Sequence, residues 1–73
     1  MEIISVNSSR ILSVGYNASN QQLLVVFKNG IQFLHQHVPQ NFWLELMLAP
    51  SLGKYYFDNI RFSFPYISQK NAN

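Results

Sequence analysis

The sequence predicts an α+β fold, an antiparallel β-meander of three to four strands followed by one or two short helices. In the first half of the chain, short stretches rich in β-branched and aromatic residues alternate with clusters of turn-forming residues. In the second half, Pro39 and Pro50 enclose a segment long enough for a helix. A chain of 73 residues can build only one hydrophobic core, so we expect a single domain over residues 1–73.

Three strands are predicted from local patterns. The first covers residues 11–16 and places Leu12, Val14 and Tyr16 on one face. Residues 17–20 form a turn because their side chains readily bond to their own backbone. Residues 22–27 are the strongest strand, since β-branched and aromatic residues dominate there, and residues 31–38 form the third.

The turn between the second and third strands decides which residues face the core. A two-residue Asn29-Gly30 turn would place Phe27 opposite Gln32 and mix polar with apolar residues. A three-residue loop over residues 28–30, with Gly30 left-handed, gives one nearly continuous apolar face and is therefore preferred. Its pairs are Phe27 with Ile31, Val25 with Phe33, and Leu23 with His35. The opposite face is half apolar, so either the terminal segments or a second copy covers it.

The second half predicts two helical segments. Pro39 suits the first position of a helix that runs to about Ala49. The apolar residues of this helix surround its axis, so they cannot all be buried in an isolated monomer. The residues concerned are Phe42, Trp43, Leu46 and Met47. Ser51 is the expected N-cap of a second helix over residues 52–59, followed by an extended stretch over residues 60–66 and a flexible tail over residues 67–73.

The composition limits the function classes. Hydrophobic residues make up 48% of the chain and charged residues only 11%, against about a quarter in typical globular proteins. Some apolar surface is therefore expected to meet a partner or a second copy. The net charge of +2 comes from scattered residues, which is weak support for nucleic-acid binding. The chain has no cysteine, no secretory signal pattern and no apolar run near the ~20 residues of a membrane helix, so we expect a cytoplasmic protein.

Several short motifs in this order resemble the KTSC family, small domains named for their occurrence at the C-terminus of some lysyl-tRNA synthetases. The motifs are Ser8-Ser9, Val14-Gly15-Tyr16, Phe27-Lys28-Asn29-Gly30, Val38-Pro39, Ala49-Pro50-Ser51, Gly53-Lys54-Tyr55-Tyr56, Ile60-Arg61 and Phe64-Pro65-Tyr66. Phe33 and His35 stand where the family has two tyrosines, and Phe57 stands where asparagine is frequent. The resemblance implies no established activity. It does imply RNA binding as a hypothesis, and a stand-alone bacterial or phage-like protein.

No group of side chains predicts catalysis. The chain lacks a glycine-flanked serine turn, and its three glycines form no phosphate-binding loop. His35 and His37, two apart on a predicted strand, project from one face and have the spacing of two metal ligands. No third ligand accompanies them in the sequence. We therefore expect no enzyme activity, no metal and no other cofactor.

Cations beside aromatic residues provide the candidate site, because single-stranded RNA binders combine phosphate contacts with base stacking. The candidate nucleic-acid contacts are Lys54, Tyr55, Arg61, Tyr66, Phe33 and His35. The structural alternative is that the tyrosines pack in the core. Arg61, between two apolar residues, must lie over a ring, bond to helix-end carbonyls or reach a ligand.

Two function hypotheses follow. The first is a non-enzymatic module that binds RNA, which the resemblance and the candidate contacts support. The second is a protein-interaction module, either a homodimer or a small phage-type inhibitor of a host protein, which the low charge and surplus apolar surface support.

Overall fold

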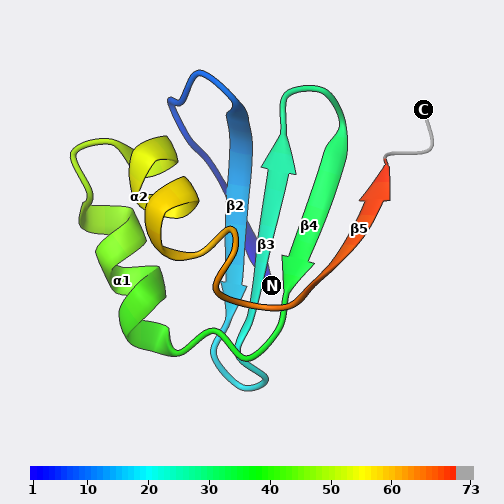
Figure 1. Cartoon of the computed structure of the whole chain (residues 1–73), viewed down its shortest axis with the longest axis vertical. Helices are drawn as coiled ribbons and strands as arrows, with labels where there is room; N and C mark the ends of the chain where they lie inside the picture. The colour runs from blue at the N-terminus through cyan, green and yellow to red at the C-terminus, as the bar shows by residue number, and fades with distance from the viewer. Residues whose placement is uncertain (71–73) are drawn as a thin grey trace.

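The structure, a computed structural model, describes residues 1–70. Five antiparallel strands form one sheet in the order β1-β2-β3-β4-β5, and two helices lie on one side of it (Figure 1). The elements are β1 (Glu2–Ser5), β2 (Ile11–Asn17), β3 (Gln22–Phe27), β4 (Ile31–His35), α1 (Gln40–Leu48), α2 (Leu52–Asn59) and β5 (Tyr66–Lys70). None of the helices within residues 1–70 is long and apolar enough to span a membrane.

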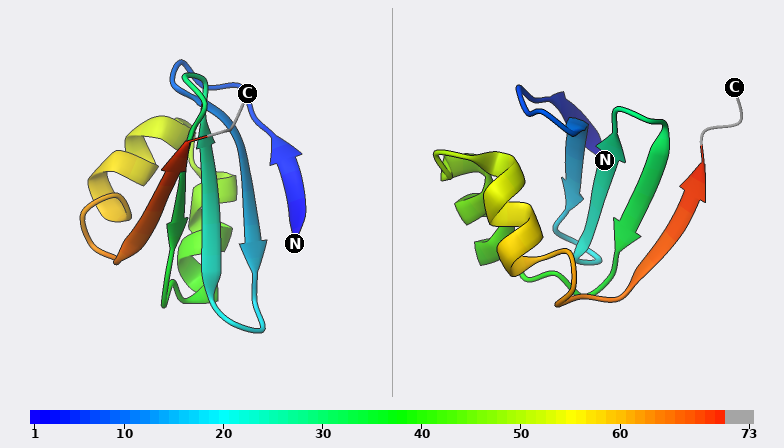
Figure 2. Two further views of the ribbon diagram at one scale, coloured as in Figure 1. Left: turned by 90° about the vertical axis from the view of Figure 1, so that its right-hand side faces the viewer. Right: turned by 45° about the horizontal axis from the view of Figure 1, so that its top comes forward.

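The α+β class is confirmed, but the strand count rises to five. The additional strands are β1, at one edge of the sheet, and β5, which follows the helices and pairs with β4 at the other edge. Residues 67–70, expected in a flexible tail, therefore belong to a strand, while residues 71–73 lie outside the described residues. The extended stretch expected over residues 60–66 is instead a series of turns up to Phe64. The second view shows β5 leaving these turns beside β4 (Figure 2).

The predicted hairpin register is confirmed. Val25 lies opposite Phe33, and Leu23 lies opposite His35. Gly30 has a φ of 92°, a conformation that side chains with a Cβ rarely adopt, and its N–H donates to the Phe27 carbonyl at 3.0 Å. The Asn29 side chain accepts from the backbone of the next strand at 3.0 Å.

Strand β2 corrects the predicted face of Leu12. The register shifts between Ile11 and Ser13, so Leu12 is the extra residue of a β-bulge. Ile11 and Val14 are consequently both fully buried, whereas Leu12 is 51% exposed rather than on the face of Val14.

Strand β4 is shorter than predicted and ends at His35. His37 has a φ of 62°, so the chain turns away from the sheet there. The Tyr16 hydroxyl donates to the Val38 carbonyl at 2.6 Å, and the Val38 N–H donates to the Gln21 carbonyl at 2.9 Å. These bonds fix the connection that leads into α1.

The helices and one face of the sheet enclose the core. Its fully buried hydrophobic residues are Ile11, Val14, Leu23, Val25, Val38, Leu46, Tyr56 and Ile60. Pro39 is the N-cap of α1 rather than its first helical residue, and the Ser51 side chain caps α2 as predicted by accepting from the Lys54 N–H at 3.3 Å.

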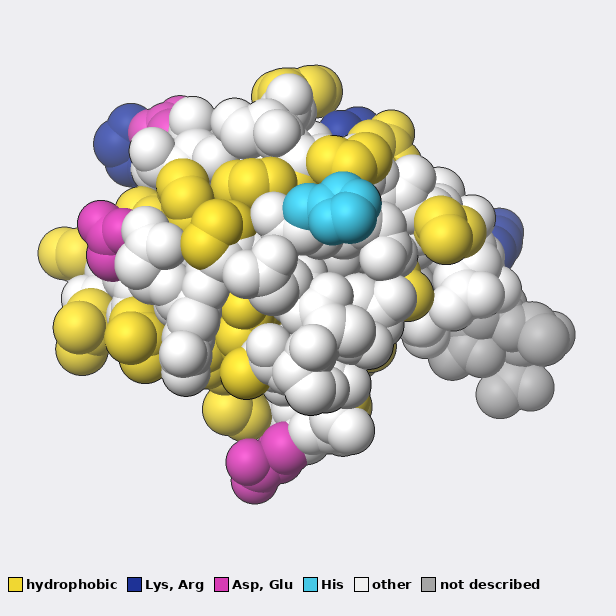
Figure 3. All heavy atoms as spheres, turned by 90° about the horizontal axis from the view of Figure 1, so that it is seen from below, with side chains coloured by type: hydrophobic (Ala, Val, Ile, Leu, Met, Phe, Trp, Pro, Cys, Tyr) yellow, Lys and Arg dark blue, Asp and Glu magenta, His cyan; other side chains and the backbone are white. Residues whose placement is uncertain are grey.

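As predicted, some of the apolar residues of α1 remain exposed. Only Leu46 is fully buried, whereas Phe42, Trp43 and Met47 pack partly against the core. Leu44 and Leu48 are 52% and 83% exposed. In the view from below, hydrophobic side chains gather on the side of the molecule where the helices lie (Figure 3).

Candidate functional site

Three of the five basic residues converge on one groove with three phenylalanine rings. The groove has a volume of about 390 Å³ and lies between the β3–β4 hairpin and α2. Its lining, which we call the aromatic groove, comprises Arg10, Lys28, Arg61, Phe27, Phe33 and Phe57, with Ser9, Asn29 and Ile31. No carboxylate belongs to this lining, so the groove is electropositive.

The fold explains how the rings come together. The three-residue turn keeps Phe27 and Phe33 on the face of the sheet that α2 covers only in part. The Phe27 ring meets Phe33 edge-on at 5.1 Å and lies 6.4 Å from Phe57 of α2. All three rings are partly buried, so the core holds one side of each while the groove exposes another.

Arg61 lies over aromatic rings, which is one of the three roles that its sequence position allowed. Its guanidinium carbon is 4.6 Å from the centres of Phe33 and Phe62 and 4.7 Å from that of Tyr66. The Arg61 backbone N–H donates to the Tyr56 carbonyl at 2.9 Å, which fixes the residue at the end of α2. Within residues 1–70 no carboxylate forms an ion pair with Arg61.

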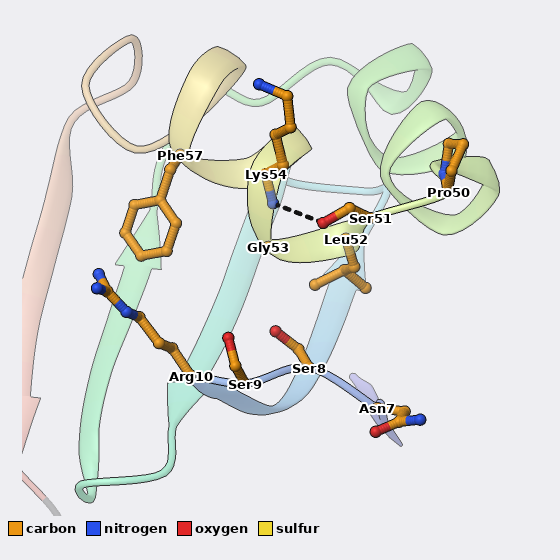
Figure 4. Close-up of a pocket in the computed structure, with 10 residues that line it drawn as sticks. All are labelled: Asn7, Ser8, Ser9, Arg10, Pro50, Ser51, Leu52, Gly53, Lys54 and Phe57. Carbon is orange, nitrogen blue, oxygen red and sulfur yellow. Dashed lines mark hydrogen bonds between the residues drawn. The ribbon is translucent and has the colours of Figure 1, made fainter.

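Arg10 reaches the groove from the segment before β2. Its guanidinium carbon is 5.7 Å from the Phe57 ring centre. Figure 4 shows this guanidinium beside the ring, at the edge of a second cavity whose lining includes Ser8, Ser9 and Gly53. The sequence analysis missed Arg10 because no neighbouring aromatic residue marks it, and only the fold brings Phe57 to it.

Lys54 and Tyr55 lie apart from the other predicted contacts. The Lys54 ammonium pairs with Asp58 at 2.8 Å, and this hydrogen bond raises the pKa of Lys54. Figure 4 shows its side chain directed away from the second cavity. Burial and the neighbouring Glu45 carboxylate raise the pKa of Tyr55. Of the six candidates, the structure therefore groups Arg61, Phe33 and Tyr66 at the surface, with His35 beneath them.

His35 is fully buried and both its ring nitrogens have partners. Nδ1 lies 3.2 Å from the Phe64 carbonyl, which can only accept, so Nδ1 carries the proton. Nε2 then accepts from the Tyr56 hydroxyl at 2.7 Å. Burial lowers the pKa of His35, with a further contribution from the Arg61 charge, against the opposing effect of the Phe64 hydrogen bond. The imidazole therefore holds the turn after α2 in place.

The two histidines do not share a strand face. His35 points into the core, whereas His37 lies in the turn beyond β4 and is exposed. This corrects the predicted geometry for a pair of metal ligands. In the described part of the chain, no three metal-ligating side chains lie together.

Comparisons with known proteins agree with the resemblance drawn from the sequence motifs. The family model of the KTSC domain matches residues 7–64. The structure is similar to the crystal structure of the KTSC domain protein YPO2434 from Yersinia pestis, with a TM-score of 0.85, 30% sequence identity and coverage of 96% of each chain. No curated protein matches the chain.

Proposed function

This chain belongs to the KTSC domain family, and we propose that it is a small non-enzymatic module that binds single-stranded RNA in the aromatic groove. The observation that carries the proposal is the convergence of Arg10, Lys28 and Arg61 on three phenylalanine rings without a carboxylate. Single-stranded nucleic acid is held in this way, by cations that contact phosphates and aromatic faces that stack with bases.

The placement of charge supports an anionic ligand. Of the three carboxylates in the chain, Asp58 is paired with Lys54, Glu45 lies on α1 and Glu2 lies on β1. Lys70 lies opposite Ile31, a groove residue, and antiparallel partners point to the same face. Four of the five basic residues thus border one side of the molecule.

The buried histidine supports a binding role rather than catalysis. A general base needs a free ring nitrogen within reach of a substrate. Both nitrogens of His35 are instead occupied by the Phe64 carbonyl and the Tyr56 hydroxyl.

Fluorescence anisotropy with labelled 12-nucleotide single-stranded RNAs tests the proposal, at several salt concentrations. We expect binding that weakens with salt, and weaker binding when Arg10 and Arg61 are both replaced by alanine. The matched control is Lys54→Ala, which removes a cation outside the groove and should leave the affinity unchanged. Absence of RNA binding at low salt, with the fold verified by circular dichroism, would refute the proposal.

A second candidate function is self-association through the sheet face opposite the helices. The register places Ile3, Gly15, Leu24, Leu34 and Ile67 in one row across all five strands. Ile3 and Ile67 are 48% and 60% exposed, and the row carries no charge. Exposed apolar surface of this kind is typical of interfaces between proteins.

Sedimentation equilibrium over a range of protein concentrations tests this second candidate. A dimer that persists at high salt and dissociates in Ile67→Lys would support it, because salt does not screen apolar contacts. A monomer at all concentrations would exclude it.

A further inference from the structure

Shared arginines link three cavities on the basic side of the molecule, whereas a fourth cavity, which shares Pro50, Ser51 and Lys54 with the first, has no arginine in its lining. Arg10 lines both the cavity next to Ser8 and Ser9 and the aromatic groove. Arg61 lines both the aromatic groove and a third cavity that contains Phe62 and Tyr66. The volumes are about 350, 390 and 490 Å³ in this order.

The two shared arginines differ in the number of rings around them. Each lies beside aromatic rings: Arg10 by Phe57, and Arg61 by Phe33, Phe62 and Tyr66. Neither forms an ion pair or a side-chain hydrogen bond within residues 1–70. Their N–H donors therefore have no side-chain acceptor in this part of the chain, and a phosphate oxygen can accept from them.

The cavities between these arginines have the size of small-ligand sites. Each volume lies within the range of about 300 to 1,000 Å³ for such pockets. The middle cavity offers the rings Phe33 and Phe57, and the third offers Phe62, which is 82% exposed, and Tyr66, which is 40% exposed. The first is bordered by serine hydroxyls.

Resting on the proposed function, we infer that the site binds a segment of three nucleotides. One nucleotide occupies each cavity, and the two phosphates that join them contact Arg10 and Arg61. The alternation of cavity and arginine corresponds to the alternation of base and phosphate along a single strand.

NMR titration of ¹⁵N-labelled protein with uridine and with oligouridylates of two to six nucleotides, all without terminal phosphates, tests the inference. We expect the affinity to rise steeply up to three nucleotides and only slightly beyond. For two phosphate contacts on a single strand, the slope of log K against log salt should be about −1.4. Arg10→Ala and Arg61→Ala should each weaken the trinucleotide about tenfold and each reduce the slope by about 0.7.

Two controls keep the test decisive. Leu48→Ala, at a side chain of α1 that is 83% exposed and lines none of the three cavities, should leave both the affinity and the slope as in the wild type. Arg61→Lys retains the charge without the planar guanidinium, so it distinguishes lost binding from lost folding if Arg61→Ala unfolds. It should keep the slope and lose affinity.

The outcomes separate this inference from the proposed function. An affinity that keeps rising steeply to six nucleotides, or slopes unchanged in both arginine variants, would overturn the three-nucleotide site while RNA binding stands. If RNAs of every length, including the 12-nucleotide RNA, fail to bind, both the three-nucleotide site and the proposed function would be overturned.

Discussion

Replacing Tyr56 with phenylalanine should be among the most destabilising removals of a single atom in this protein. The Tyr56 hydroxyl is fully buried and donates to His35 Nε2 at 2.7 Å. In Tyr56→Phe the ring still fills the core, but Nε2 remains buried without a donor. An unsatisfied buried acceptor costs about 1–3 kcal/mol. Because both nitrogens of His35 are bonded in the wild type, no alternative tautomer restores the lost bond.

This loss corresponds to a large shift in melting temperature because the protein is small. For 73 residues, an unfolding entropy of about 2.1 cal/mol/K per residue gives roughly 0.15 kcal/mol/K. A loss of about 1–3 kcal/mol should therefore lower the melting temperature by roughly 7–20 °C. Thermal unfolding followed by circular dichroism measures it.

The neighbouring tyrosine provides the matched control. Tyr55→Phe removes a hydroxyl from the same helix, but Tyr55 is only partly buried, so the change in stability should stay within about 0.5 kcal/mol. A Tyr56→Phe variant that melts with the wild type, or no lower than Tyr55→Phe, would refute the deduced hydrogen-bond scheme around His35.

Four further perturbations have expected outcomes. Burial lowers the pKa of His35 in the folded protein, so the unfolded chain binds the proton at a higher pH than the folded one does. The contribution of neutral His35 to stability is therefore complete above about pH 6.5, and the free energy of unfolding falls below that pH by at most about 1.4 kcal/mol per pH unit. Equal free energies of urea unfolding at pH 7.5 and pH 5.0 would contradict this. Gly15→Ala would place a methyl 2.7 Å from Ile3 Cδ1 and 2.8 Å from a backbone oxygen, which should cost about 1–3 kcal/mol in denaturant unfolding. Ser51→Ala removes the cap of α2 and should cost about 1 kcal/mol in the same assay; an unchanged midpoint would show that the cap contributes nothing. Phe62→Ala should change stability by less than about 0.5 kcal/mol, since the side chain is 82% exposed, yet weaken RNA binding; equal affinity would remove Phe62 from the site.

The elements that the sequence predicted well are those with strong local signals. The positive φ of Gly30 and the apolar pattern of the flanking strands fix the hairpin register without help from the rest of the chain. Ser51 caps α2, and Pro50 separates the two helices. In each case the residue type restricts the backbone or satisfies it within a few positions.

The missed elements depend on distant partners. Strand β5 is polar at Ser68, Gln69 and Lys70, as an edge strand can be, and only the open edge of β4 provides its hydrogen bonds. The bulge at Leu12 arises because β2 must bury Ile11 and Val14 together, a requirement that a two-residue period does not show.

The candidate site was only partly predictable for the same reason. Arg61 and Tyr66 were found because cations beside aromatic residues stand out in the sequence, and Phe33 because it stands at a tyrosine position of the family motif; the fold does bring these three together. Lys54 satisfied the same pattern, but Asp58 one helical turn later pairs with it. Arg10 lies 47 positions from Phe57 in the chain, so no local pattern joins them.

The structural role of Arg61 and its proposed role in ligand binding are compatible. The three rings around its guanidinium hold a side chain that would otherwise carry about 2 kcal/mol of rotamer entropy. They contact the guanidinium without forming hydrogen bonds to it, so its N–H donors remain for a phosphate. A cation already ordered in the free protein loses little entropy on binding, which strengthens each contact that it makes. In the proposed function, two well-held arginines therefore bind the anionic strand, where a larger number of mobile lysines would otherwise be needed.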